Sequence, residues 1–184
     1  MKRTIKIFFF VCSTAIFFSC KSKSKPAGAD TGTERKWWKE ATVYQIYPRS
    51  FQDSDGDGVG DLKGIISRLD YIKSLGIDAV WLNPIYESPN KDNGYDISDY
   101  QNIMKQFGNM DDFDKLLKGF HDRGIKVMMD MVLNHCSDQH QWFQEAKKSR
   151  NSPYYNYFHW WPAEKGEPPY RWSIFDEKAY GWEF

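Results

Sequence analysis

The most distinctive chemistry in this sequence lies in a short acidic loop. Every second residue from position 53 offers an oxygen ligand, and Gly58 stands at the sixth position of the loop. The candidate ligands are Asp53, Asp55, Asp57, the Val59 carbonyl and Asp61. Hard oxygen ligands at alternating positions let one tight turn wrap a divalent cation, and Ca²⁺ fits this set better than Mg²⁺, which stays possible. Gly64 stands where an EF-hand carries a bidentate glutamate, so we expect a calcium loop that is not an EF-hand. A hydrated acidic turn without a metal is the alternative.

A second group of polar side chains follows the segments that we expect to form strands. Asp92 and Tyr95 come after the second expected strand, and Asp130, Asn134 and His135 close the third. In parallel α/β proteins the working residues lie at the carboxyl ends of strands, so these side chains are candidates for one ligand site. A lone histidine is more often structural, but the company of Asp92 and Tyr95 favours ligand contact for His135.

Asp130 interrupts the apolar run from Val127 to Leu133, and we therefore expect it inside the sheet or barrel. A buried carboxylate must be paired or protonated. A structural ion pair and membership of the ligand site both remain open for it. Cys136 could act as a nucleophile, but a lone cysteine is more often a small packed residue.

The elements that must position these side chains alternate in type. β-Branched and aromatic residues predict strands over 42–51, 77–82 and 125–133. Helical spacing of apolar residues, with Asp61 as an N-cap and with Gly76 and Gly124 as stops, predicts helices over 61–75 and 109–123. Nearly continuous apolar strands in this order indicate an α/β fold with a parallel sheet covered on its faces. A doubly wound sheet and a (β/α)8 barrel, which needs about 250 residues, both begin this way.

The N-terminal residues have the pattern of an export signal. A basic start is followed by an apolar run over 7–18 and by Ser19-Cys20, which together predict a signal peptide of the lipoprotein type over 1–20, lipidated at Cys20. The run is shorter than the about 20 residues of a membrane span, and ordinary cleavage or an uncleaved anchor are the alternatives. Residues 21–36 are small, polar and charged, so we expect a flexible tether.

Composition narrows the class of partner. The chain has 25 basic and 25 acidic residues, and this balance does not suit a polyanion, so we expect no nucleic acid partner. The aromatic content of 17% fits either a core of large side chains or a surface that stacks on sugar rings. Cys136 is the one cysteine beyond the signal, so we expect no disulfide within the folded part.

Five segments resemble, in order and spacing, the opening of oligo-1,6-glucosidases and α-glucosidases of the α-amylase family, glycoside hydrolase family 13. These segments are YQIYPRSF, DSDGDGVGDLKGI, LGIDAVWLNPIYESP, DNGYDISDY and DMVLNH. The resemblance covers about residues 37–184. It implies a (β/α)8 TIM barrel whose first three βα units occupy 37–139, followed by the start of an inserted domain B over 140–184.

The resemblance also implies a role for each candidate residue. Asp92 would hydrogen-bond hydroxyls of a terminal glucose, the ring of Tyr95 would stack on that glucose, and His135 would contact its O6 side. Asp130 would be structural, paired with an arginine from the fourth strand, and Asn134 would support the same region. The acidic loop matches the metal loop of the family.

The implied activity is a retaining hydrolysis of α-glucosidic bonds at the non-reducing end of oligosaccharides. Two carboxyl groups about 5 Å apart act in turn in such a reaction. The family takes its catalytic acids from later strands, so we expect no catalytic residue among these 184 residues and no activity from this piece alone. The expected substrate is an α-gluco-oligosaccharide, and the expected location is the periplasm or cell surface, with membrane contact only through the lipid. The alternatives are a transglycosylating or isomerising relative, forming trehalose or isomaltulose, and a non-catalytic amylase-like ectodomain.

Overall fold

The computed structural model describes residues 36–169. The predicted signal peptide with Cys20, nearly all of the tether, and residues 170–184 of the expected domain B lie outside the described residues. In the described part no helix combines the length and the apolar character that crossing a bilayer requires. The fold lies in the unit that begins at Trp37.

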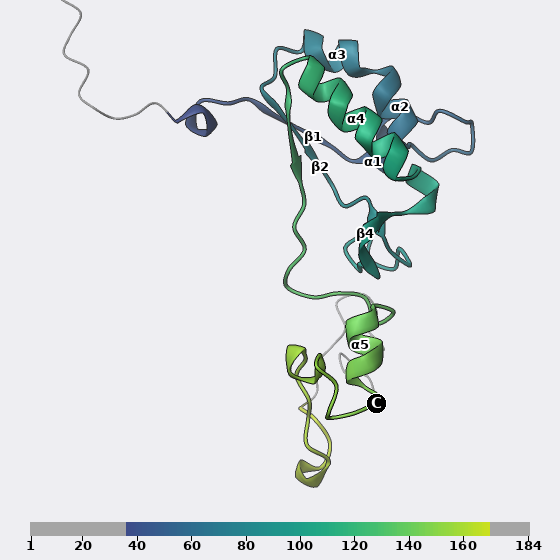
Figure 1. Cartoon of the computed structure of the whole chain (residues 1–184), viewed down its shortest axis with the longest axis vertical. Helices are drawn as coiled ribbons and strands as arrows, with labels where there is room; N and C mark the ends of the chain where they lie inside the picture. The colour runs from purple at the N-terminus through teal and green to yellow at the C-terminus, as the bar shows by residue number, and fades with distance from the viewer. Residues whose placement is uncertain (1–35, 170–184) are drawn as a thin grey trace, which may run out of the picture. The chain divides into compact units, whose positions relative to one another are not determined.

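A three-stranded parallel sheet forms the centre of this unit (Figure 1). Its strands, in the spatial order β1-β2-β5, are β1 (Val43–Ile46), β2 (Ala79–Leu82) and β5 (Lys126–Met129). All three were predicted, and all three are shorter than predicted. The first predicted strand ends at Ile46 because Pro48 begins a helical turn, α1 (Pro48–Phe51), where the fixed φ of proline suits the first helical position.

The predicted helix over 61–75 is two short helices, α2 (Leu62–Ser67) and α3 (Leu69–Ser74). They are separated at Arg68, whose φ of −110° and ψ of 8° depart from helical values. Asp61 caps α2 as predicted, because its side chain accepts a 2.7 Å hydrogen bond from the Gly64 amide. The apolar spacing therefore identified the buried face correctly, but two consecutive helices form it instead of one.

The second predicted helix is confirmed as α4 (Met110–Asp122). Its N-cap is Asn109, whose side chain accepts a 3.0 Å hydrogen bond from the Asp112 amide. Gly76 and Gly124 end their helices with φ of 71° and 70°, the left-handed region that favours glycine. The start and stop signals read from the sequence are thus the ones that the backbone uses.

The helices cover one face of the sheet, and the apolar core lies between them (Figure 1). Successive strand side chains point to opposite faces, so Ile46, Val80 and Leu82 enter this core. The core residues that α2, α3 and α4 contribute are Leu62, Ile65, Leu69, Ile72, Leu116 and Phe120. The opposite face carries the register-aligned side chains Gln45, Trp81 and Met128, and Met128 is 40% exposed. Among the described residues, helices therefore cover one of the two sheet faces that the sequence predicts to be covered.

An antiparallel hairpin between β2 and α4 was not predicted. It pairs β3 (Tyr86–Glu87) with β4 (Asp99–Ile103), and residues 88–98 form the loop between them. Strands this short leave little alternation to read. The hairpin positions the loop that carries Asp92 and Tyr95.

The segment that follows β5 is packed through contacts between aromatic side chains and not through amphipathic helices. Its helix is α5 (Gln141–Ala146), which is capped by His140. The ring of Tyr100 in β4 lies 5.5 Å from that of His140 and 5.9 Å from that of Trp142. The structure also has short 3₁₀ turns among the described residues: η1 (Trp37–Lys39), η2 (Lys105–Phe107), η3 (Tyr155–Tyr157) and η4 (Ala163–Lys165). Packing by rings explains why the sequence shows no periodicity here.

Candidate active site at the strand ends

Asp130 lies directly after β5 and is held by two aromatic side chains. The indole Nε1 of Trp81 donates a 2.7 Å hydrogen bond to its Oδ1, and the hydroxyl of Tyr95 donates a 2.8 Å hydrogen bond to its Oδ2. Both donors are neutral, and the carboxylate is half-buried. Within the described residues Asp130 is therefore held by neutral donors, and the arginine of a fourth strand that the resemblance implies stays a prediction.

The hydrogen-bond chain continues from Tyr95 back into the sheet. The Asn83 amide donates to the Tyr95 hydroxyl at 2.9 Å, and the Gln45 amide donates to Asn83 Oδ1 at 2.9 Å. Gln45 lies in β1 and Asn83 directly follows β2, so the chain crosses from one strand to the next. Our reading of the sequence gave no role to Gln45, Trp81 or Asn83. These residues could have been found from the sequence, because each places a polar atom among or directly after the apolar residues of a strand.

Tyr95 is a hydrogen-bond donor that stays neutral at ordinary pH. Burial raises its pKa, the hydrogen bond to Asp130 and the charge of that acid raise the pKa further, and Asn83 opposes these effects. Tyr86 has its pKa raised by burial and then by the same charge, and its hydroxyl donates to the Asp130 carbonyl at 2.8 Å. Asp130 thus accepts hydrogen bonds from two tyrosine hydroxyls that remain protonated, one at its carboxylate and one at its carbonyl.

Asp92 and His135 approach each other from separate segments. Asp92 Oδ2 lies 4.0 Å from His135 Nε2, with the side chains 25% and 47% exposed. This separation is too long for a direct hydrogen bond. Asn134 Nδ2 lies 3.3 Å from His135 Nδ1. An amide nitrogen can only donate, so this contact fits the tautomer that carries the imidazole proton on Nε2, on the side of Asp92.

The hairpin loop and the segment directly after β5 hold all five predicted residues of the ligand site. The Tyr95 amide donates to the Asp92 carbonyl at 2.9 Å, so the two side chains share one turn of the hairpin loop. The hydroxyl of Tyr100 lies 2.7 Å from the Val132 carbonyl and 3.1 Å from the His135 carbonyl, which holds the segment after β5 against β4. The structure therefore gathers these residues at the carboxyl ends of β2 and β5.

Cys136 lies beside this site without the features of a nucleophile. It is half-buried, and burial raises the pKa of its thiol. A raised pKa leaves little of the reactive thiolate at neutral pH.

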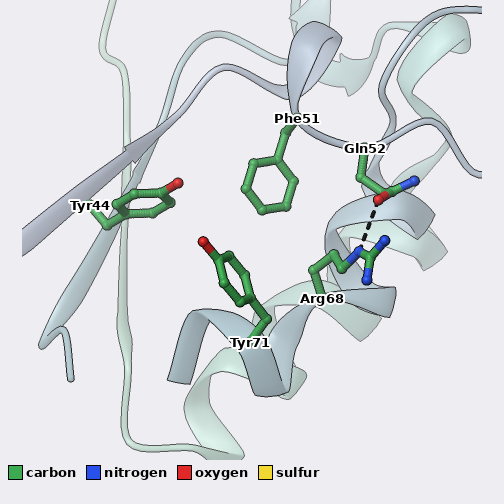
Figure 2. A pocket seen from close by; sticks show the side chains of 5 residues that line it. All are labelled: Tyr44, Phe51, Gln52, Arg68 and Tyr71. Carbon is green, nitrogen blue, oxygen red and sulfur yellow. Dashed lines mark hydrogen bonds between the residues drawn. The ribbon is translucent and has the colours of Figure 1, made fainter. Parts of the chain in front are cut away.

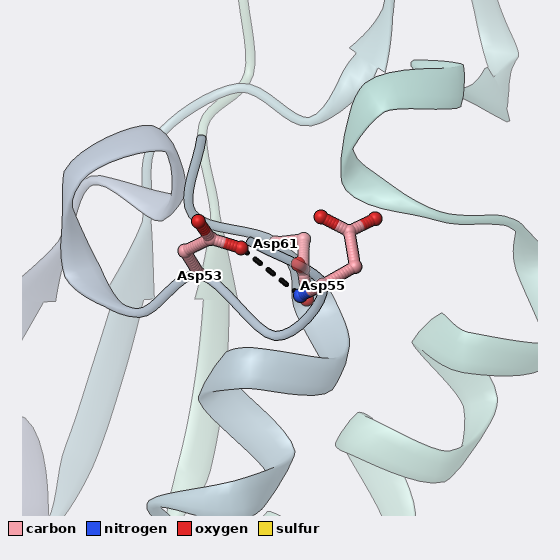
Figure 3. A group of neighbouring side chains, drawn as sticks. All are labelled: Asp53, Asp55 and Asp61. Atoms are coloured by element: carbon pink, nitrogen blue, oxygen red, sulfur yellow. Dashed lines mark hydrogen bonds between the residues drawn. The ribbon is translucent and has the colours of Figure 1, made fainter. Parts of the chain in front are cut away.

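The acidic loop between α1 and α2 brings three of its four carboxylates together (Figure 3). Oxygen atoms of Asp53, Asp55 and Asp61 all lie within 4.8 Å of one another. Asp57 is not part of this group, and its carboxylate accepts a 2.7 Å hydrogen bond from the Val59 amide. Carboxylate oxygens that converge in this way fit a hard divalent cation.

Backbone amides shape this loop around Asp53. Its Oδ1 accepts from the Gly56 amide at 2.7 Å and its Oδ2 from the Gly58 amide at 2.8 Å. These two hydrogen bonds are the largest causes that lower the pKa of Asp53. Asp61 has two tasks, since Oδ1 caps α2 and Oδ2 accepts from the Ser54 amide at 3.0 Å. The loop geometry is therefore coupled to the start of α2.

A hollow of about 320 Å³ lies elsewhere (Figure 2). It is lined by Tyr44, Phe51, Gln52, Arg68 and Tyr71, and Arg68 Nε donates to Gln52 Oε1 at 2.9 Å. Tyr44 and Gln45 are neighbours in β1, so their side chains point to opposite faces of the sheet. The hollow therefore lies on the helix-covered side and contains none of the predicted site residues.

The fold and the site together define a class of protein. A parallel α/β layer that collects an acid, a tyrosine and a histidine at its strand ends is typical of α/β enzymes that bind ligand at that edge. Residues 45–184 match the catalytic domain of α-amylase, and the chain belongs to that family. The family resemblance read from five sequence segments is thereby confirmed.

Similar proteins of known name cover most of this chain. An oligo-1,6-glucosidase of Parageobacillus thermoglucosidasius is 58% identical over 152 residues, which are 82% of this chain and 27% of that protein. One from Bacillus cereus is 60% identical over 140 residues, 76% of this chain and 25% of that protein. Among solved structures, the isomaltulose synthase SmuA from Protaminobacter rubrum matches with a TM-score of 0.71 at 55% identity, over 74% of this chain and 25% of that one. The chain spans about a quarter of the length of these relatives.

Proposed function

We propose that this chain forms the glucose-binding part of a retaining α-glucosidase, which acts at the non-reducing end of α-gluco-oligosaccharides. The observation that carries the proposal is the convergence of Asp92, Tyr95 and His135 at adjacent strand ends, with the 4.0 Å approach of Asp92 to His135. The oligo-1,6-glucosidases cited above are similar over this same segment. The proposal gives the role of nucleophile or of acid/base to none of the acids in the ligand site or in the acidic loop.

The geometry supports separate contacts of these three side chains with one hexose. The 4.0 Å gap suits a sugar hydroxyl that accepts from His135 Nε2 and donates to Asp92. The Tyr95 hydroxyl is already engaged by Asn83 and Asp130, so the part of Tyr95 left for a ligand is its ring. An aromatic ring offers an apolar face to the C–H groups of a pyranose.

We propose that β1, β2 and β5 are the first three strands of a (β/α)8 barrel, with domain B beginning near residue 140. Two observations support this. The strand order advances in one direction, and the helices cover one face only. The polar face, with Gln45 and Trp81, would then line the barrel interior, and the strand-end residues would lie at its rim.

For the acidic loop we propose a structural Ca²⁺ site built on Asp53, Asp55 and Asp61, with Asp57 and the Val59 carbonyl as the further oxygens that the sequence pattern nominated. Convergence of the three carboxylates supports it. A bound cation would supply rigidity where the loop enters α2. Export as a periplasmic or cell-surface lipoprotein, lipidated at Cys20, remains a proposal from the sequence.

The test of the activity is glucose release by the complete protein. We expect glucose from isomaltose or maltose with retention of the α-anomer, observed by NMR of the first product. Conversion of sucrose to isomaltulose would instead favour an isomerising enzyme, a candidate supported by the likeness to isomaltulose synthase. Glucose binding without turnover of any of these sugars would favour a non-catalytic ectodomain.

A further inference from the structure

The loop that carries Asp92 adopts an unusual backbone. Asn90 and Asn93 have φ of 59° and 52°, and Gly94 has φ of 93°. Asparagine enters the left-handed region more readily than other residues with a side chain, but two of them in one short loop still need surrounding contacts to hold that loop in place. Those contacts therefore decide where the Asp92 side chain points.

Asp96 is the residue at which these contacts meet. Its Oδ1 accepts from the Ser88 hydroxyl at 2.8 Å and from the Asp92 amide at 3.0 Å. Its Oδ2 accepts from the Lys91 amide at 2.9 Å. The Ser88 oxygen in turn accepts from the Asn90 amide at 2.9 Å, and Ser88 is 7% exposed. One carboxylate thus ties the base of the loop to the residues at its tip.

The chemistry of these contacts needs a carboxylate. Three donors converge on two oxygen atoms, and an ionised carboxyl group accepts at both oxygens without donating. An amide at residue 96 would place an NH₂ group opposite either the Lys91 amide or the pair formed by Ser88 and the Asp92 amide. A donor would then face a donor, and the loop would shift.

We propose that Asp96 is a positioning residue that aims the Asp92 carboxylate across the gap to His135, and so sets the affinity for the terminal glucose. This inference rests on the proposed function of that site. Asp96 acts through the Asp92 backbone, and within residues 36–169 the hydrogen bonds of its carboxylate go to Ser88, Lys91 and Asp92. Asp92 makes the sugar contact, and Asp96 fixes the position from which that contact is made.

The test is a double-mutant cycle in the complete protein with glucose as the probe. Asp96→Asn is expected to raise the dissociation constant of glucose, measured by calorimetry, by roughly tenfold to a hundredfold, because a displacement near 1 Å at a binding group has effects of this order. In the Asp92→Asn background the same substitution is expected to change it by less than about twofold, since residues that act as one unit are not additive. An equal effect in both backgrounds would overturn the proposal.

Asp99→Asn is the matched control. Asp99, the first residue of β4, accepts from the Gln101 amide at 2.7 Å and from the Asn102 side chain at 2.6 Å, so it too is a carboxylate that accepts local hydrogen bonds, but these bonds do not go to the Asp92 loop. Its substitution should leave glucose affinity within about twofold of the wild-type value. A loss as large as that of Asp96→Asn would show a general effect of removing a hydrogen-bonded carboxylate from the hairpin and contradict the proposal.

Ser88→Ala keeps the test decisive if Asp96→Asn does not fold. It removes one of the three donors to Asp96 and should weaken glucose binding by a smaller factor, about twofold to tenfold, with the same loss of effect in the Asp92→Asn background. Unchanged glucose affinity in both Asp96→Asn and Ser88→Ala would sink the positioning role. Wild-type protein that fails to bind glucose at all would instead sink the proposed function, so the two failures are distinguishable.

Discussion

The hydroxyl of Tyr95 donates a 2.8 Å hydrogen bond to the carboxylate of Asp130, although the two residues belong to different strand-end segments. Trp81 supplies the second neutral donor to that acid, and Asn83 supplies the donor to Tyr95. The contact therefore joins the hairpin loop to the end of β5 at the point where a ligand is proposed to bind. It fixes the phenol end of Tyr95 and leaves the ring for the sugar.

Replacing Asp130 by asparagine tests whether both acceptors are needed. The amide offers one acceptor in place of two, so either Trp81 or Tyr95 loses its partner, and a buried unpaired donor costs about 1–3 kcal/mol of the free energy of unfolding. Urea unfolding of the complete protein measures this. Asp122→Asn removes an exposed pair with Lys118 and should cost less than about 0.5 kcal/mol. Equal losses for the two variants would contradict the network.

Two substitutions at Tyr95 separate its hydroxyl from its ring. Tyr95→Phe keeps the ring and should lower stability by about 1 kcal/mol, because the hydrogen bonds with Asn83 and Asp130 are lost, with little change in glucose affinity. Tyr95→Ala also removes the apolar contact and should weaken glucose binding by roughly tenfold to a hundredfold. Tyr71→Ala, on the helix-covered side, is the control and should not alter affinity. Equal affinity of the phenylalanine and alanine variants would argue against stacking.

Removing one charge from the acidic loop tests the metal proposal. Asp55→Asn keeps an oxygen that can accept from the Asp57 amide, so the loop should still form. The lost charge should weaken Ca²⁺ binding by about tenfold or more, because ligand charge sets the affinity of such sites. Calorimetric titration of metal-free protein and the rise of Tm with Ca²⁺ are the measurements. Asp114→Asn, an exposed acid in α4, should leave both unchanged, and wild-type protein indifferent to Ca²⁺ would refute the site.

The cap of α5 is predicted to weaken in acid. Burial lowers the pKa of His140 from its ordinary value of 6.5, against the opposing charge of Asp99, and its Nδ1 accepts a 3.1 Å hydrogen bond from the Trp142 amide. A neutral ring is favoured in the fold, so this stability is present above about pH 6.5 and is lost as the pH falls through the lower folded pKa. Hydrogen exchange of α5, corrected for intrinsic rates, should accelerate at pH 5.

His140→Asn should abolish this acceleration, since asparagine is a good N-cap that does not titrate in this range. His121→Asn, at an exposed position of α4, should leave it in place. An acceleration that persists in His140→Asn would show that another group is responsible.

Two helical glycines should respond differently to alanine. A Cβ at Gly64 in α2 would collide with the Gln52 carbonyl, which is backbone, whereas a Cβ at Gly119 in α4 would meet the end of the Leu69 side chain. Leu69 can turn aside, but the Gln52 backbone follows the α1 turn and cannot. We expect Gly64→Ala to lower the free energy of unfolding by more than about 2 kcal/mol, and Gly119→Ala to change it by less than half as much, since alanine favours helix. Similar Tm values for the two variants would contradict this.

Sequence reasoning succeeded where the deciding contacts are local. Asp61 and Asn109 cap the helices that follow them, and Gly76 and Gly124 end helices, because each of these contacts spans only a few residues. The same reasoning missed the break at Arg68 and the helical turn at Pro48. Apolar spacing records which face is buried, and a helix made in two pieces keeps the same buried face.

Sequence patterns identified the family, the three strands of the parallel sheet with the helices between them, and the segments that carry the candidate residues, because family motifs and hydrophobic periods are properties of neighbouring positions. The folded structure was needed to show that Asp130 is held by Trp81 and Tyr95, that Asp57 is not among the three converging loop acids, and that Asp96 accepts from the Asp92 amide. These relationships depend on which strands are neighbours, on their register and on the path of two loops. Residues that are distant in sequence come into contact only after the sheet has formed, and no local sequence pattern encodes such contacts.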